Sequence, residues 1–512
     1  MLKNPSFPLS TWLFFFFFFF LSILFICWKR FIRFKASKTQ VQKLPPGPWK
    51  LPLIGNLHQL AFSSLPHHSL RDMAKKYGPI MQLQLGEVSA TVISSPEVAK
   101  EVLKKHDTVF ANRPSVLAIE ILSYNFSGIA FTPYGDYWRQ MRKICVLELL
   151  SAKRVLSFRS VREEEVCNLV ESISLSGGLP INLSEKVFSL ANRITSRAAF
   201  GKKCKYEKQF ISLVKETLSL SGGFNVPDVF PSLKFLAFLT GMKPALEKIH
   251  KKMDKILDDI IDDKMQTSTT KDDAGDDDDV VDVLLQLRET GGLHFNITRN
   301  HIKAVTLDVV SAGSESSATT IEWAMSELLR NPRVLEKAQA EVQRVVGGRG
   351  NIDETDIEKL DYLKLVVKET LRLHPAAPII LRESREECEL SGYLIPSNRK
   401  VLINAWALGR DPEYWIDADC FRPERFQSSC IDFKGTSFEF IPFGGGKRIC
   451  PGISFALATI ELALSQLLYH FKWKLPNEIK PEELDMSESF GLTSKRRNDL
   501  YIVATPWISG LT

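Results

Sequence analysis

A cysteine lies in a glycine-rich segment near the carboxyl end of the chain. The segment runs from Phe443 to Gly452 with the sequence FGGGKRICPG, and its cysteine is Cys450. Three consecutive glycines let the backbone turn tightly and approach a flat ligand without Cβ clashes. A thiolate in such a loop would receive backbone N–H groups, which lower its basicity and tune a metal bound to it. Arg448 can reach a carboxylate of the same ligand, and a helix expected after Pro451 would add its positive end nearby. A phosphate loop is a poorer interpretation because the GxxxxGK[ST] spacing is missing, and a bare turn would not need the cysteine.

Two further pairs have helical spacing. Glu369 and Arg372 are three residues apart on a helical pattern from 364 to 373, so they share one face. Such pairs are common on surfaces and contribute little there, so this pair gains weight only from two later segments, His374-Pro375 and the FRPERF segment with Arg425. Trp138 and Arg142, four residues apart, also share a helical face. Alone they would indicate a surface helix with a core tryptophan.

A small-residue segment interrupts a long helical pattern from about residue 300 to 329. It reads Ala312-Gly-Ser-Glu-Ser-Ser317. Glycine destabilises the interior of a helix, so the presence of Gly313 in this pattern requires an explanation. A patch for close helix packing remains an alternative for Ser314 and Ser317.

These segments, in this order, resemble the cytochrome P450 family across residues 44 to 504, and in detail its plant microsomal members of specialised metabolism. The glycine-rich segment matches the signature F-x-x-G-x-R-x-C-x-G at each specified position. The resemblance implies haem b, with Cys450 as the axial ligand of the iron. It also implies cofactor contacts and a structural triad. The cofactor contacts are Trp138, Arg142, Arg382, Phe443, Arg448, Cys450 and Gly452, and the buried triad is Glu369, Arg372 and Arg425.

The resemblance also assigns roles to the long helix. Gly313, with Ala312, would open space over the iron, while Glu315 and Ser316 would deliver protons to reduced oxygen. The family usually has threonine where this chain has Ser316, and serine lacks the methyl group that restricts χ1. The substrate contacts implied are Val309, Ala312, Ile379, Ile380 and Leu492.

The amino terminus predicts a membrane anchor. Residues 12 to 28 are apolar apart from Ser22, and a basic cluster comes directly after them. This order favours an uncleaved span with the body on the cytoplasmic side over a cleaved signal. We therefore expect an anchor at 1–28, a basic and proline-rich hinge at 29–50, and one catalytic domain at 51–512, located at the endoplasmic reticulum membrane.

The composition excludes other classes of protein. The net charge of +6 is modest and the basic residues are spread along 512 residues, so no nucleic-acid role is indicated. The eight cysteines form no CxxC pair and no disulfide framework. Alternating residues at 80–85 and 90–93 predict a short hairpin, and helical patterns dominate the rest. The expected fold is mainly α with a minor β portion, the cytochrome P450 fold after an amino-terminal transmembrane helix.

The implied activity is insertion of one oxygen atom from O2 into a hydrophobic metabolite. Electrons would come from NADPH through cytochrome P450 reductase, with cytochrome b5 as a further possible partner. A terpenoid, either a diterpenoid or a sesquiterpenoid, is the first expectation for the substrate, and an alkaloid is the second. Two other classes stay open: a reductase-independent isomerase or dehydratase of the same family, and a non-catalytic haem-binding protein.

Overall fold

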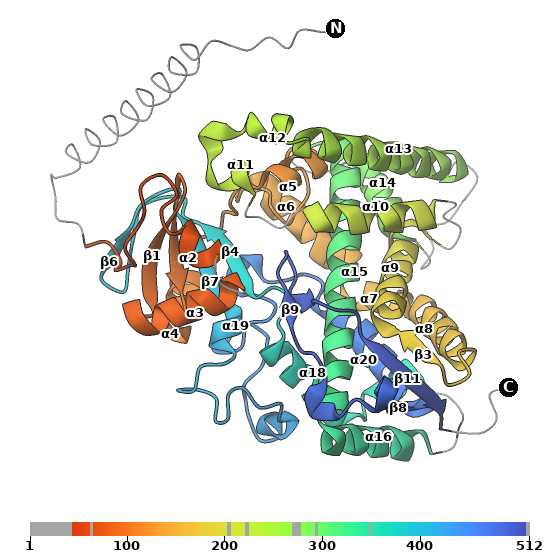
Figure 1. The fold of residues 1–512 in the computed structure, drawn as a ribbon. Coiled ribbons are helices and arrows are strands. Elements are labelled where there is room, and N and C mark those ends of the chain that lie inside the picture. The colour runs from red at the N-terminus through yellow and green to blue at the C-terminus, as the bar shows by residue number, and fades with distance from the viewer. Residues whose placement is uncertain are drawn as a thin grey trace, which may run out of the picture.

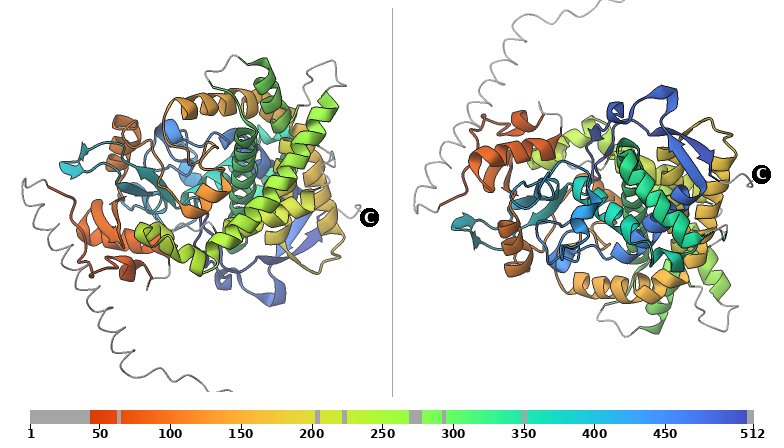
Figure 2. Two further views of the ribbon diagram at one scale, coloured as in Figure 1. Left: turned by 90° about the horizontal axis from the view of Figure 1, so that it is seen from above. Right: turned by 90° about the horizontal axis from the view of Figure 1, so that it is seen from below.

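A four-stranded sheet with short helices lies beside a larger group of long helices (Figure 1). The computed structural model describes residues 43–507 apart from 62–64, 202–205, 221–224, 269–277, 292–294, 348, 350 and 351. Both views of Figure 2 keep the sheet on one side of the molecule and the long helices on the other. The expected anchor at 1–28 and most of the hinge lie outside the described residues.

The sheet has the strand order β1-β2-β7-β4. Its strands are β1 (Ile80–Leu85), β2 (Val88–Ile93), β7 (Lys400–Asn404) and β4 (Ile379–Glu383). β2 and β7 are parallel, whereas the other two pairs are antiparallel. The short helices beside it are α2 (Leu57–Ala61), α3 (Pro66–Tyr77), α4 (Pro96–Lys100) and α19 (Ala405–Leu408). The hairpin expected from the alternating pattern is confirmed, with β2 beginning two residues earlier.

Helices form the larger part. They are α5 (Leu117–Leu122), α6 (Asp136–Ile144), α7 (Ala152–Ser157), α8 (Arg159–Ser174), α9 (Leu183–Phe200), α10 (Glu207–Leu220), α11 (Val226–Val229), α12 (Leu236–Leu239), α13 (Met242–Ser268), α14 (Val280–Thr290), α15 (Arg299–Arg330), α16 (Pro332–Val346), α17 (Glu354–Ile357), α18 (Asp361–Leu373) and α20 (Ile453–His470). Small sheets complete the described part of the fold: β3 (Pro180–Asn182) with β11 (Tyr501–Pro506) and β8 (Phe471–Lys474), β9 (Glu488–Ser489) with β10 (Lys495–Arg496), and β5 (Cys388–Leu390) with β6 (Tyr393–Ile395). The expected fold, mainly α with a minor β portion, is confirmed.

Helix α15 runs through the middle of the helical part (Figure 1). Its first turn is capped by Thr298, whose side chain accepts a hydrogen bond from the backbone N–H of His301. It packs most extensively on α9 and α20, and buried side chains of these three helices belong to one core cluster with α8, α16 and α18. This packing fixes the middle of α15, where the Ala312–Ser317 segment lies.

Helix α20 begins directly after the Cys450 segment. Among the described residues it is the one helix long and apolar enough to cross a membrane, but most of it is buried in the core. Burial of most of the helix explains its largely apolar sequence, because a helix enclosed by other elements needs no continuous polar face.

Candidate active site

The glycine-rich segment forms a tight loop whose backbone is closed by a hydrogen bond from the N–H of Cys450 to the carbonyl of Phe443, at 3.0 Å. Gly446 has φ +64°, and a Cβ there would lie 2.3 Å from the carbonyl oxygen of Leu103. Any other residue would therefore displace the loop from its neighbour. Glycine is required at this position for both its backbone conformation and its close contact.

The Cys450 thiol is half-buried beside positive groups. Burial raises its pKa, whereas a hydrogen bond from Gly452 and the guanidinium groups of Arg142 and Arg113 act in the opposite direction. A metal ion bound there would replace the proton of the thiol. The hydrogen bond from Gly452 and the two guanidinium groups would then stabilise the resulting thiolate. Cys145 is fully buried, and burial raises its pKa to about 12, so it is a poor competitor as a ligand.

Arg448 joins this loop to α6 and to the loop before it. Its guanidinium stacks on the Trp138 ring at 4.1 Å and donates to the carbonyl oxygens of Ala111, at 2.7 Å, and Ile129, at 3.2 Å. The Trp138 indole donates to the same Ile129 carbonyl at 3.0 Å. Arg142 donates to the carbonyl oxygen of Ile449. The structure thus brings the predicted Trp138, Arg142 and Arg448 together next to Cys450.

Four arginines share this neighbourhood: Arg113, Arg142, Arg382 and Arg448. Burial, together with repulsion between the guanidinium groups, lowers the pKa of Arg113 to about 10 and of Arg448 to about 9, and holds that of Arg382 well below its usual range. The Nε atoms of Arg113 and Arg382 are buried and have no hydrogen-bond partner. Asp107 offers one carboxylate nearby.

This excess of buried positive charge tests the fit of the cofactor. Buried charges are stable only when they are paired, and two more carboxylates would complete the arginine cluster. Haem b carries two carboxylates and an iron that accepts a thiolate, so the donor set fits it. Arg113 was not predicted as a cofactor contact. It lies in the segment that also contains Ala111, whose carbonyl accepts a hydrogen bond from Arg448. In the sequence, only its position directly before Pro114 sets it apart.

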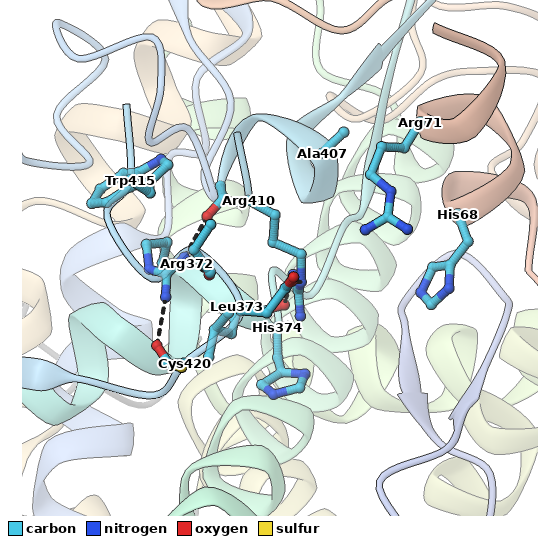
Figure 3. A network of polar contacts seen from close by, with 12 residues as sticks. His68, Arg71, Arg372, Leu373, His374, Ala407, Arg410, Trp415 and Cys420 are labelled. Atoms are coloured by element: carbon cyan, nitrogen blue, oxygen red, sulfur yellow. Dashed lines mark hydrogen bonds and ion pairs between the residues drawn. The ribbon is translucent and has the colours of Figure 1, made fainter. Parts of the chain in front are cut away.

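The expected triad is present and buried. Arg372 makes two 2.8 Å hydrogen bonds to the two carboxylate oxygens of Glu369, and Arg425 adds a third at 2.9 Å. Arg372 also donates to the carbonyl oxygens of Gly409, Ala418 and Cys420 (Figure 3). The triad therefore fixes α18 to the irregular chain between residues 409 and 425.

The middle of α15 packs closely against α9 at Gly313. The ideal Cβ position of Gly313 lies 2.9 Å from a methyl carbon of Thr195 on α9, so this glycine permits close packing of two helices. Ser314 belongs to the same contact, because its hydroxyl lies 2.6 Å from that of Thr195. The opening role of Gly313 stays a prediction, while Ala312 is exposed in the middle of the helix.

The two proton-handling candidates lie next on α15. The Ser316 hydroxyl donates to the carbonyl of Ala312 at 2.7 Å. Burial raises the pKa of the Glu315 carboxyl, although the positive charge of Lys495 and a hydrogen bond from Thr493 partly offset this. The Glu315 carboxyl therefore keeps a proton to higher pH than an exposed glutamate would.

An apolar pocket lies between the sheet and the β9–β10 hairpin. Residues that line it include Val116, Pro378, Ile379, Leu381, Phe490 and Leu492. Ile379 and Leu492 were predicted substrate contacts. Along β4, alternate side chains point to opposite faces, and Ile380 is buried in the core with Ile80 and Val401, so its substrate contact stays a prediction. Val309 lies on α15 and packs, partly buried, against a core cluster; its substrate role stays a prediction.

Asp308 is a further site residue whose role the sequence did not reveal. Its carboxylate accepts hydrogen bonds from the backbone N–H groups of Ile129, at 2.6 Å, and Ala130, at 3.0 Å. Gly128 allows this approach, since a Cβ there would lie 2.1 Å from the carboxylate. Asp308 thus positions the loop whose Ile129 carbonyl accepts from Trp138 and Arg448.

Comparison with known proteins gives consistent results. The family model described as cytochrome P450 matches residues 45–500. A melianol synthase of Ailanthus altissima is 58% identical, covering 93% of this chain and 92% of that protein. A premnaspirodiene oxygenase of Hyoscyamus muticus is 55% identical, with coverage of 95% and 97%. A solved zebra fish cytochrome P450 with abiraterone superposes with a TM-score of 0.74 at 24% identity, covering 87% of this chain and 99% of that one.

Replacing Arg372 with methionine should destabilise the fold strongly. The change leaves the buried Glu369 carboxylate with part of its donors missing, and breaking a buried pair in this way costs about 3–5 kcal/mol. Chemical denaturation measures the loss in free energy of unfolding. Arg333→Met, an exposed change on α16, serves as the control and should stay within about 0.5 kcal/mol. Equal stabilities of the two variants would contradict the structural role of the triad.

Replacing Arg113 with methionine should weaken retention of the cofactor. One lost charge-assisted hydrogen bond is worth about 1.5–3 kcal/mol, which corresponds to about 10- to 100-fold in haem affinity. Transfer of haem to an excess of apomyoglobin measures this. Arg139→Met removes an exposed arginine of α6 and should leave haem retention unchanged. Equal retention by both variants would remove Arg113 from the cofactor site.

Replacing Asp308 with asparagine should change the pH dependence of stability. Burial raises the pKa of Asp308, so its ionised form is less favourable in the folded protein and stability falls as pH rises through this pKa. The amide cannot ionise, so Asp308→Asn should lose less stability as the pH is raised from about 4, the ordinary pKa of an aspartate, toward neutrality. Thermal unfolding across this range measures the difference. Parallel curves for the two proteins would contradict the assignment.

Proposed function

The chain belongs to the cytochrome P450 family and is an NADPH- and O2-dependent haem-thiolate monooxygenase, and we propose that it oxidises a terpenoid. The observation that carries the proposal is the site itself: a half-buried thiol, a cluster of buried arginines and an apolar pocket within one fold. The names of two relatives, a melianol synthase and a premnaspirodiene oxygenase, support terpenoids as the substrate class.

Residues of this chain divide the work between them. Bound haem supplies iron that activates O2 for insertion of one oxygen atom into a C–H bond. Cys450 would hold the iron, and Arg113, Arg142, Arg382 and Arg448 would hold the two carboxylates. Glu315 would hold a proton on its carboxyl group and pass it toward Ser316, whose hydroxyl is oriented by the Ala312 carbonyl.

The apolar pocket would orient the substrate. Leu381 and Arg382 both lie within β4, where Leu381 pairs with Leu402 and Arg382 with Val401 of β7. Because the two residues are consecutive in a strand, their side chains point to opposite faces. Leu381 faces the pocket, and Arg382 is buried toward the Cys450 loop. Apolar walls with few polar groups suit a hydrocarbon scaffold.

A redox partner would approach the Cys450 side of the molecule. Exposed cations lie there on α6 and in the Cys450 loop: Arg139, Lys143 and Lys447. They would attract an acidic surface, which fits cytochrome P450 reductase and, as a further partner, cytochrome b5.

The membrane location is also proposed. Large apolar side chains are exposed on two neighbouring segments: Trp49, Leu53 and Ile54, and Phe235, Phe238 and Leu239. The β1–β2 turn links the two regions: the N–H of Gly86 bonds to the carbonyl of Ile54, and that of Glu87 bonds to the carbonyl of Val229 on α11, which precedes the second segment. Such a patch favours contact with lipid, and together with the predicted anchor it supports a single-pass protein of the endoplasmic reticulum.

The test is product mass from membranes that contain the protein, fed with sesquiterpenoid, diterpenoid, triterpenoid and alkaloid scaffolds. We expect a product heavier by one oxygen from a terpenoid, formed only with both NADPH and reductase. Cys450→Ala is the control without a thiolate and should form none. Turnover of an alkaloid alone would overturn the substrate class, and conversion of a hydroperoxide without reductase would favour the isomerase alternative.

A further inference from the structure

A buried carboxylate, Glu488, lies at the base of the β9–β10 hairpin. His67 on α3 is fully buried, and its Nε2 lies 2.7 Å from Oε2 of Glu488. The Ser494 hydroxyl donates to the same oxygen at 2.9 Å. Two more histidine nitrogens approach: Nε2 of His68 at 3.8 Å and Nδ1 of His374 at 3.9 Å, and neither has a hydrogen-bond partner.

The tip of this hairpin lines the apolar pocket. Phe490, Gly491 and Leu492 line it together with Ile379 and Leu381. The outgoing arm of the hairpin is fixed to the helical part, because the Trp323 indole of α15 donates to the Ser494 carbonyl at 3.0 Å. The N–H of Ser494 bonds to the carbonyl of Ala376 at 2.9 Å. The incoming arm is held at Glu488, and its partner His67 belongs to α3, beside the sheet.

Charged groups surround the carboxylate on several sides. Figure 3 shows His68 and Arg71 projecting from α3 toward Arg410 and His374. The other nitrogen of His374 lies 2.7 Å from Glu327 on α15. Glu488 has a pKa lowered to about 2: burial alone would raise it, but the hydrogen bond and charge of His67, and the charges of His374 and Arg410, outweigh that effect. Glu488 is therefore ionised at every pH at which the enzyme would work.

A metal ion is a weaker interpretation of the same cluster. Ligand atoms of His67, His68 and Glu488 lie within 4.8 Å of one another. However, Arg71 and Arg410 stack on Trp406 within 5 Å of its ring, and their charges reach His68. Two adjacent guanidinium groups oppose a divalent cation and stabilise an anion. An ionised carboxylate shared by several donors fits the surroundings better.

We propose that Glu488 is a positioning residue for substrate orientation: it ties the hairpin tip that lines the pocket to α3 and to the segment after α18. The inference rests on the proposed function for its substrate class. A carboxylate held by His67 and Ser494 fixes the position of Leu492 relative to Ile379, which lines the same pocket. Loss of the Glu488 contacts would leave the haem site intact and change which carbon of the substrate lies next to the iron.

The test compares Glu488→Gln with Glu482→Gln, an exposed change on the same segment. Glutamine keeps the size of the side chain and removes the charge. We expect an altered ratio of oxidised isomers and a decrease of about tenfold in kcat/KM for the main product, because small displacements of a bound substrate are costly. The content of thiolate-ligated haem, read from the carbon monoxide spectrum, should equal that of the control.

A second readout needs no turnover. Imidazoles with N-substituents of increasing size bind the haem iron, and their dissociation constants are read from the spectral shift. Glu488→Gln should change the affinity for the large imidazoles and leave that for imidazole itself unchanged. If the wild-type enzyme oxidises no terpenoid, the proposed substrate class fails while this measurement still decides the role of Glu488.

Two further variants keep the proposal falsifiable if Glu488→Gln does not fold. Ser494→Ala removes one donor and should shift both readouts in the same direction by a smaller factor. His67→Gln retains a hydrogen-bond donor to Glu488, so its isomer ratio and imidazole affinities should be close to those of the wild type. His67→Leu removes the donor and should change both. Unchanged isomer ratios and imidazole affinities in the folded variants would overturn the proposal. Stabilisation of the wild-type holoenzyme by zinc ions, lost in Glu488→Gln, would overturn it in favour of a metal site.

Discussion

Burial of several guanidinium groups around one thiol is the constraint on which the rest of the active site depends. Each of these arginines is held by main-chain oxygen: Arg113 by Leu381, Arg142 by Ile449, Arg382 by Gly445, and Arg448 by Ala111 and Ile129. Three parts of the chain that are distant in sequence, the loop before α6, strand β4 and the Cys450 loop, are joined in this way. Because carbonyl dipoles only partly compensate a buried cation, the assembly retains a strong preference for an anionic ligand. The same charge lowers the pKa of the Cys450 thiol and so opposes burial, which raises it.

The second organising feature is the close approach of α9 and α15. Thr195 occupies the space that a side chain at Gly313 would need, and its hydroxyl meets that of Ser314. The contact with α9 therefore holds the backbone of α15 in place at the turn that also carries Ala312, Glu315 and Ser316, which do not take part in this contact. This packing also bears on the serine at 316. Its hydroxyl is directed by the Ala312 carbonyl, so part of the restraint that a threonine methyl would provide is supplied by a hydrogen bond.

Local sequence patterns predicted much of this structure and left out what depends on tertiary contact. The hairpin and the long central helix were predicted from periodicity, whereas the Glu369–Arg372–Arg425 triad was predicted from the resemblance to the family, because the spacing of Glu369 and Arg372 alone is common on surfaces. The sequence did not distinguish Ile379, which lines the pocket, from Ile380, which is buried in the core. The register of β4 decides which of two adjacent isoleucines faces the pocket, and composition does not reveal register. The roles of Arg113 and Glu488, and the role of Asp308 in positioning a loop, were not predicted for a different reason. Their partners are backbone groups or histidines that lie far away in sequence, such as His67 for Glu488.

The arginines and the triad bind carbonyl oxygens, and this has a consequence for how such a protein changes over generations. Every residue type carries a carbonyl group, so the loops that receive these hydrogen bonds can exchange side chains without losing the bonds. Residues such as Leu381, whose carbonyl accepts from Arg113 while its side chain lines the pocket, illustrate the separation. Mutation can alter the wall of the pocket while the frame around the thiol persists. Diversification of substrate choice on a constant reactive centre is then an expected outcome of natural selection acting on this fold.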